Sequence, residues 1–374
     1  MAVTFTAESV TAGQPDKLCD LIAEKILDET LKQDPQAYVG CEAAVSGNNV
    51  TIMGEITSAA KISYEDVARG AIAQAGYETP GLGFDAQTCG VTTQIREQSE
   101  DIARGILRKD PFSSGAGDQG EVFGYACCET ADFMPLPITL AHRLARRLEK
   151  ARREGEIAYL RPDGRAQITM EYTDSRPQRI AAIILSAQHT PWMKTEQLRA
   201  ELAQKIISKT IGEEWIDDQT QIYINPTGRF VLGGPAAHVG LTGRKQTVDA
   251  YGGAVPQSGS LAGKDPSKIH RSAAYAARYL AKNFVAAGLA KRCEIRLAYA
   301  MGLADPISLN VECFHTETTK EERLKKFAEE LMDLRPAAIS ERFGLRRPIY
   351  EKLSCYGHFG ENAAEMPWEQ IDLF

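Results

Sequence analysis

The sequence predicts an α+β protein of two or three domains, and three observations support this prediction. The chain has 374 residues, which is more than one compact core usually spans. Helical periodicities with recognisable caps occur along its whole length, separated by short strand-like runs. These helices and strands do not alternate strictly as βαβ units, so an α+β arrangement is favoured over one doubly wound sheet.

In the first part of the chain, capping residues define two helices around a hairpin. Pro15 suits a first helical position, because it lacks the N–H that a helix start leaves unpaired. Ser63 is a favourable cap for a second helix, and Gly76 is a typical residue just after a helix end. The expected elements are a helix over 15–31, a hairpin over 38–55 with its turn at 46–49, and a helix over 63–75.

The rest of the chain predicts further helices and strands around two glycine-rich loops. Residues 102–120 predict a mobile loop and a domain boundary, and residues 233–263 predict loops around a site. Asp265 and Pro266 predict the cap and first position of a long helix that runs to Gly288. The remaining expected elements are helices over 138–155, 195–210 and 320–334, and strands over 167–172, 180–186, 221–224, 293–300 and 308–314.

Composition narrows the classes of function. A formal net charge of −7 opposes attraction of the whole surface to nucleic acid or to an anionic membrane, so neither is an expected partner. The eight cysteines are scattered and contain no CxxC pair, so a zinc site is not expected. The first residues lack the apolar core of a secretory signal, and no run of about 18 apolar residues occurs. We therefore expect a cytoplasmic protein with reduced cysteines.

Two segments combine carboxylates with a helix start or with glycines. Asp16 and Asp20 lie one turn apart at a predicted helix N-terminus, where a carboxylate can hold magnesium against a phosphate, although acidic first turns are also common in solvated helices. Asp118 stands among three glycines over 115–120, which allow close approach to a ligand but equally suit a flexible loop. No P-loop motif occurs.

Two further segments present cations. Arg244 and Lys245 follow a glycine turn and suit a polyphosphate, although a solvated basic turn has the same pattern. Lys264 and Lys268 flank a predicted helix N-terminus, where the helix dipole disfavours cations. A bound anion between the two lysines is one explanation for this placement, and two lysines without a ligand are the other. Together the four segments suggest a site for a phosphate chain with a divalent metal.

The same segments resemble the S-adenosylmethionine synthetase family over nearly the whole chain. GAGDQG and the helix RSAAYAAR are the most specific strings of this resemblance. The matching strings are ESVTAGQPDK at 8–17, GFDAQTCGV at 83–91, GAGDQG at 115–120, LRPDGR at 160–165, NPTGRF at 225–230, GLTGRK at 240–245, GKDPSK at 263–268 and RSAAYAARYLAKN at 271–283.

The resemblance implies three similar α+β domains of mixed sheet and helices around a pseudo-threefold axis, expected at residues 1–101, 114–231 and 233–374. It also implies a homodimer or homotetramer whose subunits share active sites, each with a gating loop at about 98–110. The implied reaction is attack of the sulfur of L-methionine on C5′ of ATP, followed by hydrolysis of the released triphosphate to diphosphate and phosphate. Two Mg²⁺ and one K⁺ are the implied cofactors, and such a reaction needs aligned reactants and a stabilised leaving polyanion.

The resemblance also assigns roles to individual positions. Asp16 matches a magnesium ligand, Glu42 the potassium ligand, and Glu55 and Gln98 match positions that recognise methionine. The phosphate-facing basic set corresponds to Arg229, Arg244, Lys245, Lys264 and Lys268, of which Arg244, Lys245 and Lys264 are expected to be catalytic. Asp118 and Asp163 match positions at the substrates, and Phe230 matches the residue against adenine.

Four positions depart from the family pattern. Gln14 replaces a histidine near the leaving 5′ oxygen and keeps a hydrogen-bond donor without charge, and Arg165 replaces a lysine; both remain expected catalytic residues. His238 replaces an aspartate near the methionine amino group, and His270 replaces an aspartate that binds magnesium. Imidazole is a poor ligand for magnesium, which prefers oxygen.

These departures leave three interpretations open. The first is an ordinary synthetase whose changes compensate one another. The second is an enzyme of the same fold with another nucleophile or nucleotide, or with triphosphatase activity alone. The third is a catalytically silent regulatory paralogue. A softer metal between His238 and His270 is a minor alternative, and His142, in the arginine-rich helix, is expected to be solvated.

Overall fold

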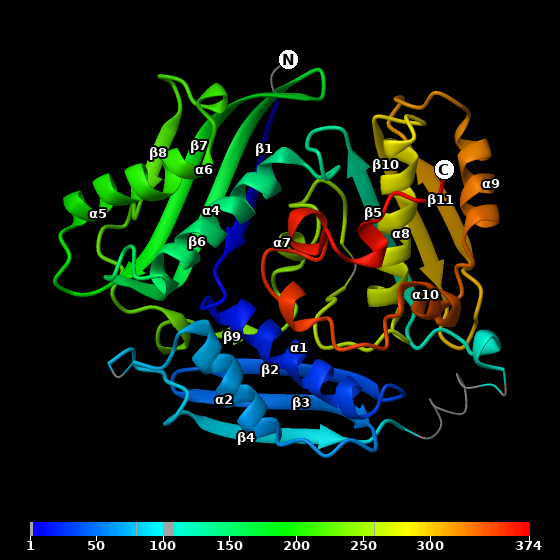
Figure 1. The fold of residues 1–374 in the computed structure, drawn as a ribbon, viewed down its shortest axis with the longest axis horizontal. Helices are drawn as coiled ribbons and strands as arrows, with labels where there is room; N and C mark the ends of the chain where they lie inside the picture. The colour runs from blue at the N-terminus through cyan, green and yellow to red at the C-terminus, as the bar shows by residue number, and fades with distance from the viewer. Residues whose placement is uncertain (1–2, 80, 100–107, 109, 258) are drawn as a thin grey trace.

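Three β-sheets, each covered by helices on one face, form the computed structural model of the chain (Figure 1). The structure describes residues 3–79, 81–99, 108, 110–257 and 259–374. The predicted α+β class with three sheet-containing units is therefore confirmed. Residues 100–107 and 109, which make up most of the predicted gating loop at 98–110 and part of the predicted mobile loop over 102–120, lie outside the described residues.

The first sheet has the order β4-β3-β2-β9 and forms the lower part of Figure 1. The predicted hairpin and both predicted helices are confirmed: Ser63 caps the second helix through the N–H of Asp66, and Gly76 ends it in the left-handed conformation. The elements are α1 (Pro15–Gln33), β2 (Tyr38–Ser46), β3 (Asn49–Thr57), α2 (Tyr64–Ala75), β4 (Gly90–Arg96) and β9 (Gly240–Leu241).

The second sheet has the order β1-β6-β7-β8, and a long helix with apolar residues along one face covers it. The helix predicted over 195–210 is divided by a π-helical segment over 203–207, which adds one residue to a turn. The elements are β1 (Val3–Val10), α4 (Leu136–Arg153), β6 (Leu160–Thr173), β7 (Arg176–His189), α5 (Thr195–Leu202), α6 (Ser208–Thr210) and β8 (Gln221–Ile224).

The third sheet has the order β11-β10-β5, and its central helix is buried over almost its entire length. This helix packs on β5 and β10, and its small residues, such as Ala273 and Ala277, allow the close approach. The elements are β5 (Gly120–Cys127), α7 (Gln246–Asp249), α8 (Ile269–Ala286), β10 (Arg292–Tyr299), β11 (Ser308–Glu312), α9 (Glu321–Leu331) and α10 (Pro336–Phe343).

Each sheet receives one strand from a different region of the chain. Strand β1 pairs with β6 in the second sheet, β5 pairs with β10 in the third, and β9 pairs with β2 in the first. The domain boundaries predicted at 1–101, 114–231 and 233–374 stay a prediction, and each of these segments gives one strand to the sheet of another. Every sheet is therefore completed by a distant segment, while the buried apolar residues form two clusters, one around the second sheet and one shared by the first and third sheets.

Two sequence-based predictions are wrong. The helix predicted from Asp265 begins at Ile269, because the carboxylate of Asp265 is buried and accepts hydrogen bonds from the N–H groups of Val39 and Ser267 at 2.8 Å each. His142 is buried rather than solvated, and its Nδ1 lies 2.8 Å from Oγ of Ser9.

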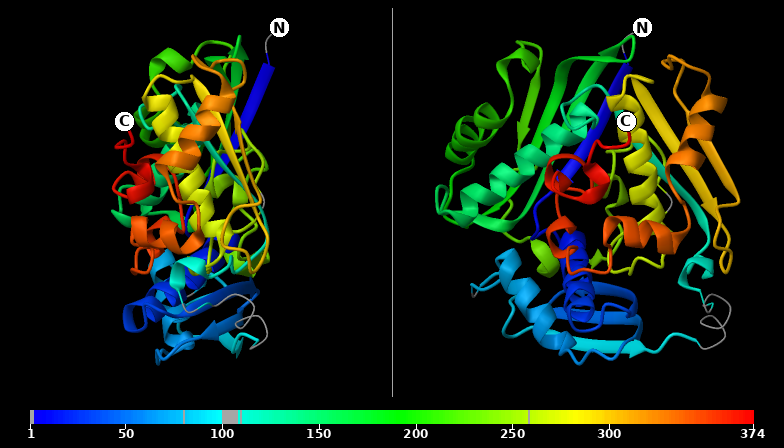
Figure 2. Two further views of the ribbon diagram at one scale, coloured as in Figure 1. Left: turned by 90° about the vertical axis from the view of Figure 1, so that its right-hand side faces the viewer. Right: turned by 45° about the vertical axis from the view of Figure 1, so that its right-hand side comes forward.

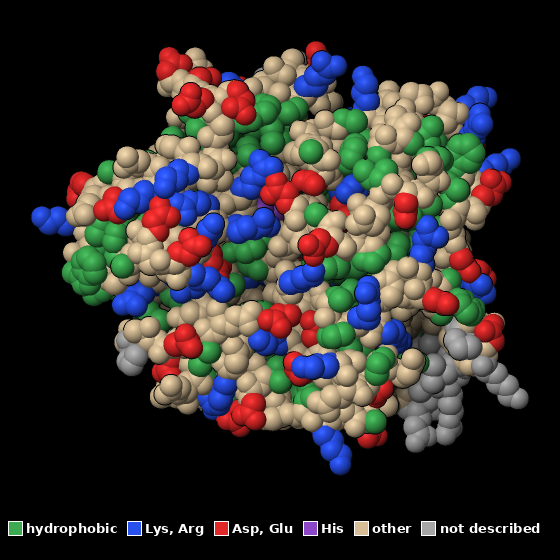
Figure 3. Space-filling view, in the orientation of Figure 1, with side chains coloured by type: hydrophobic (Ala, Val, Ile, Leu, Met, Phe, Trp, Pro, Cys, Tyr) green, Lys and Arg blue, Asp and Glu red, His purple; other side chains and the backbone are tan. Residues whose placement is uncertain are grey.

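The molecule is a slab with its helices on one side and its sheets on the other (Figures 1 and 2). On the helical side, Lys and Arg alternate with Asp and Glu, without a large area of one sign (Figure 3). Among the described residues, no helix has the length and apolar character that crossing a membrane requires.

Candidate functional site

One cavity of about 430 Å³ brings together five predicted site residues. Glu42 and Glu55 lie on neighbouring strands β2 and β3, where Glu55 pairs with Gly40 and Glu42 with Met53, so both carboxylates leave the same face of the sheet. The other three residues are Asp118, Lys264 and Lys268. The cavity therefore has three acidic and two basic side chains, a set that suits a polyanion accompanied by metal ions.

Backbone contacts to β2 position Lys264 in this cavity. Lys264 forms an isolated bridge with Gly40, and the carbonyl oxygen of Gly263 accepts the N–H of Cys41 at 2.8 Å. The Lys264 ammonium donates to the carbonyl of Ser260 at 2.8 Å. Burial lowers the pKa of Lys264, and the nearby Asp118 and Glu42 oppose this shift.

A buried ion pair behind the cavity supports the same loop, and sequence reasoning missed it. Arg271 donates to both carboxylate oxygens of Glu24 at 2.7 and 2.8 Å, and both side chains are fully buried. Glu24 also accepts the N–H of Gly263, while Arg271 donates to the carbonyls of Leu261 and Lys264. The sequence signal that could have revealed this ion pair is a charged residue on the otherwise apolar face of a helix, because charged side chains are rarely buried unless they are paired.

The structure places His270 against Asp118, at 3.4 Å from its Nε2 to Oδ2. Burial and the neighbouring Lys264 lower the pKa of His270, and Asp118 opposes the shift. The N–H of Gln119 donates to the other oxygen of Asp118 at 2.8 Å.

Gln98 follows β4, and its N–H donates to Oγ1 of Thr57 at 3.0 Å, beside the end of the strand that carries Glu55.

A second group of predicted site residues gathers around the start of α1. Asp16 accepts from Nε2 of Gln14 at 3.0 Å and from the N–H of Leu241 at 3.1 Å, and Arg244 lies 3.5 Å away. The side-chain carbonyl of Gln14 caps α1 by accepting the N–H of Lys17 at 3.0 Å. Gln14 therefore already makes one donor and one acceptor contact within the chain.

Asp163 adjoins the same group. Its Oδ2 accepts the N–H of Gly234 at 2.9 Å, whereas its Oδ1 is buried without a hydrogen-bond partner. Burial raises the pKa of Asp163, and the neighbouring Arg165 and His238 oppose the shift. The structure thus brings His238 beside the carboxylate of Asp163.

The remaining predicted residues lie at the margin of this second group. Lys245 pairs with Glu8 of β1 at 2.9 Å. The backbone N–H of Phe230 donates a hydrogen bond to Nε2 of His189 at 3.1 Å. Arg229 donates to the carbonyl of Pro191 in an exposed setting at 3.2 Å.

Asp20 does not face a substrate surface. Its carboxylate is fully buried, pairs with Lys17 at 2.9 Å and accepts the N–H of Gly243 at 2.8 Å. Lys17 also contacts Asp249, and together these two carboxylates raise the pKa of Lys17 against the effect of burial. This network fixes the turn that carries Arg244 relative to α1, so Asp20 positions the site from behind.

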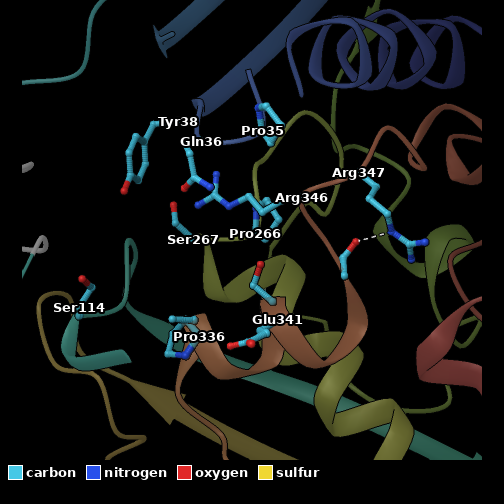
Figure 4. Close-up of a pocket in the computed structure, with 14 residues that line it drawn as sticks. Pro35, Gln36, Tyr38, Ser114, Pro266, Ser267, Pro336, Glu341, Arg346 and Arg347 are labelled. Carbon is cyan, nitrogen blue, oxygen red and sulfur yellow. Dashed lines mark hydrogen bonds between the residues drawn. The ribbon is translucent and has the colours of Figure 1, made fainter. Parts of the chain in front are cut away.

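A cavity of about 510 Å³ lies on the other side of the 264–268 segment (Figure 4). Pro266 and Ser267 line it, together with Tyr38 and Arg346, whereas Lys264 and Lys268 line the cavity described above. None of the predicted site residues lines this larger cavity. The 264–268 segment therefore contributes residues to both cavities.

The donor set fits magnesium at most of the predicted positions. Asp16, Glu42 and Asp118 offer carboxylate oxygens, which are the hard ligands that Mg²⁺ and K⁺ require. The buried unpaired Oδ1 of Asp163 provides a further acceptor near Asp16. The nitrogen of His270 does not fit magnesium, so the adjacent Asp118 is the better candidate at that position.

Three family models match successive parts of the chain. The N-terminal domain of S-adenosylmethionine synthetase matches residues 2–100, the central domain matches residues 113–230 and the C-terminal domain matches residues 232–370. Together these matches cover nearly all of the 374 residues.

Proposed function

The chain belongs to the S-adenosylmethionine synthetase family, and on this basis we propose that it makes S-adenosylmethionine from ATP and L-methionine with Mg²⁺ and K⁺. In the proposed reaction the methionine sulfur attacks C5′, the C5′–oxygen bond breaks, and triphosphate leaves. Triphosphate is then hydrolysed to diphosphate and phosphate. We further propose that the enzyme works in the cytoplasm.

The cavity that unites Glu42, Glu55, Asp118, Lys264 and Lys268 is the single observation that carries this proposal. A highly charged leaving group needs cations on one side and metal-binding carboxylates on the other. Residues separated by more than 200 positions in sequence provide both within one space. Among the described residues, no ion pair joins the two lysines to the three carboxylates, so their charges are available to a ligand.

We propose that two subunits complete each active site. Among the described residues, no hydrogen bond or ion pair joins the cavity group of Glu42 and Lys264 to the group of Asp16 and Arg244. A pair of chains would bring the cavity group of one subunit to the second group of its partner. The sheet-bearing side of the slab, opposite the helices, is the side that would face the partner in such a pair (Figure 2).

The charges suggest a division of labour within the completed site. Arg244, Lys245, Lys264 and Lys268 would neutralise the triphosphate as the C5′–oxygen bond breaks, and bound magnesium would add positive charge to the same oxygens. Glu55 and Gln98 would bind methionine, with His238 beside its ammonium group. Phe230 and Asp163 would hold the nucleoside, and Arg229 would face the outer phosphates.

The four substituted positions support one alternative function. The side-chain amide of Gln14 is already hydrogen-bonded to Asp16 and to the N–H of Lys17. It therefore has less freedom than a histidine would have to contact the leaving oxygen. Such a change would slow the breaking of the C5′–oxygen bond more than it would slow triphosphate hydrolysis. Triphosphatase activity without synthesis is therefore the second candidate function.

The test is to incubate the purified protein with ATP, L-methionine, Mg²⁺ and K⁺ and to quantify S-adenosylmethionine, diphosphate and phosphate separately. The proposal requires sulfonium product in a one-to-one ratio with diphosphate. Phosphate from added tripolyphosphate, without any sulfonium product, would establish the triphosphatase instead. Gln14→His and His270→Asp are the matched variants, and unchanged rates and metal preference in both would show that these positions have no chemical role.

A further inference from the structure

A cluster of metal-binding side chains lies far from both halves of the candidate active site. Cys313 follows β11, Glu317 lies in the next turn, and Glu321 is the first residue of α9, at the right-hand edge of Figure 1. One ligand atom from each of these residues lies within 4.8 Å of the other two. Over the described ranges, no other group of at least three His, Cys, Asp or Glu side chains has this geometry.

A second thiol lies beside the cluster. Cys293 begins the core-facing series of β10, and the pairing of Glu294 with Glu312 makes Cys293 the next cross-strand neighbour of Cys313. Both cysteines are fully buried and neither forms a disulfide. The sulfur of Cys293 lies outside the 4.8 Å group, but strand pairing places this second thiol beside Cys313 at the same end of the third sheet.

The two carboxylates differ in their contacts with the chain. Glu321 accepts the N–H of Cys313 at 2.7 Å, which fixes its side chain against the end of β11. Oε2 of Glu317 is buried and has no hydrogen-bond partner. The hydroxyl of Thr316 donates to the carbonyl of Cys313 at 2.7 Å and holds the turn closed. A buried carboxylate oxygen with no partner is unfavourable unless a proton or a metal neutralises it.

We propose that Cys293, Cys313, Glu317 and Glu321 form a tetrahedral site for a borderline-soft divalent cation, for which Zn²⁺ is the best fit. Zinc accepts thiolate and carboxylate ligands at about 2.0–2.3 Å, which places neighbouring ligand atoms about 3.4–3.8 Å apart. The ligand atoms of Cys313, Glu317 and Glu321 lie within 4.8 Å of one another and need only small movements to reach this spacing, whereas Cys293 has to turn its side chain toward them. Magnesium and potassium do not suit a site with two sulfurs.

On binding, the two thiols lose their protons to solvent and the metal forms four bonds to the chain. The ion would tie together the ends of β10 and β11 and the start of α9, and so stiffen the C-terminal sheet. The pattern is invisible to a search for CxxC motifs, because the cysteines lie 20 positions apart and meet only through strand pairing. This site is independent of the proposed catalytic function.

The test uses the full-length protein after chelator treatment and desalting under reducing conditions. Titration with Co²⁺ is expected to give a thiolate-to-cobalt charge-transfer band that saturates at one ion per chain, and Zn²⁺ is expected to abolish the band by displacement. Zinc is also expected to raise the melting temperature. Cys313→Ser should remove the band and Glu317→Gln should weaken zinc binding about tenfold or more, while Cys128→Ser, at an exposed cysteine elsewhere, should change neither.

Three results would overturn the site. They are the absence of a charge-transfer band in the wild-type protein, a band that persists in Cys313→Ser, and an intramolecular disulfide between Cys293 and Cys313 in protein freshly purified under reducing conditions. The wild-type titration needs no variant, so poor folding of a substituted chain does not affect its outcome. Cys293→Ser gives a second, independent thiol deletion.

Discussion

Replacing Lys264 with alanine is the most direct test of the phosphate-binding cavity. Among the described residues, the carbonyl of Ser260 accepts one of its three ammonium hydrogens and no other partner is present, so two hydrogens remain for phosphate oxygens. A hydrogen bond to a charged group contributes about 1.5–3 kcal/mol, and each 1.4 kcal/mol changes affinity tenfold. Lys264→Ala should therefore weaken tripolyphosphate binding by about 10-fold to 100-fold.

The neighbouring acids act in the same direction. Glu42 and Asp118 share the cavity with Lys264, so removing the ammonium leaves two carboxylates facing the incoming anion. Lys264→Arg keeps the charge but not the shape and should lose less affinity than the alanine variant. Lowering the salt concentration should widen the gap between wild type and Lys264→Ala, because partly exposed charges are then screened less.

The assay is isothermal titration of the purified protein with tripolyphosphate in fixed Mg²⁺ and ionic strength. Lys150→Ala is the matched control, because this lysine on α4 is 62% exposed and lies outside the cavity. Circular dichroism and melting temperature must match wild type in all variants. A dissociation constant for folded Lys264→Ala within twofold of the wild-type value would refute the assignment of the cavity to phosphate.

Three further outcomes follow from buried polar contacts. Glu24→Gln should lower the free energy of unfolding by about 3 kcal/mol in urea denaturation, because it leaves the buried guanidinium of Arg271 without its counter-charge; a loss below about 1 kcal/mol would contradict this. Gln14→Ala should lower the same quantity by about 1 kcal/mol, because it removes the side-chain cap on α1, and an unchanged denaturation midpoint would exclude the capping role. Burial lowers the pKa of His142 to about 3, so the unfolded chain takes up a proton below about pH 6.5 that the folded chain refuses. The stability that the neutral, buried His142 contributes is present above about pH 6.5 and is lost as the pH falls. Between pH 7 and pH 5 the free energy of unfolding of the wild type should therefore fall by about 2 kcal/mol more than that of His142→Asn, and parallel plots of unfolding free energy against pH would disprove this.

Local signals in the sequence account for many of the helices and for the hairpin. Ser63 and Gly76 delimit α2 as predicted, and the 46–49 turn joins β2 to β3. These features depend on neighbouring residues, whose dihedral preferences and hydrogen bonds act over one or two turns. Strands β1, β4 and β5 and helix α10 were not predicted, because their patterns of buried and exposed residues are set by distant partners.

The candidate site, like the fold, could be predicted only in part from the sequence. The strings around Asp16, Asp118, Lys264 and Lys268 indicated a metal- and phosphate-binding chemistry, but residue order cannot show which of them share a cavity. Strand pairing decides that Glu42, Glu55 and Lys264 face one space. It also decides that Asp265 supports β2 instead of capping α8.

The sequence alone determined the family, the α+β class and the residue types of a phosphate and metal site, since these follow from short-range patterns and motif strings. Only the tertiary structure decided that each sheet takes a strand from another segment, that His142 is buried, and that Cys293 and Cys313 are neighbours. The physical reason is that burial and long-range pairing depend on how faces far apart in the chain pack together, and no local propensity encodes that choice.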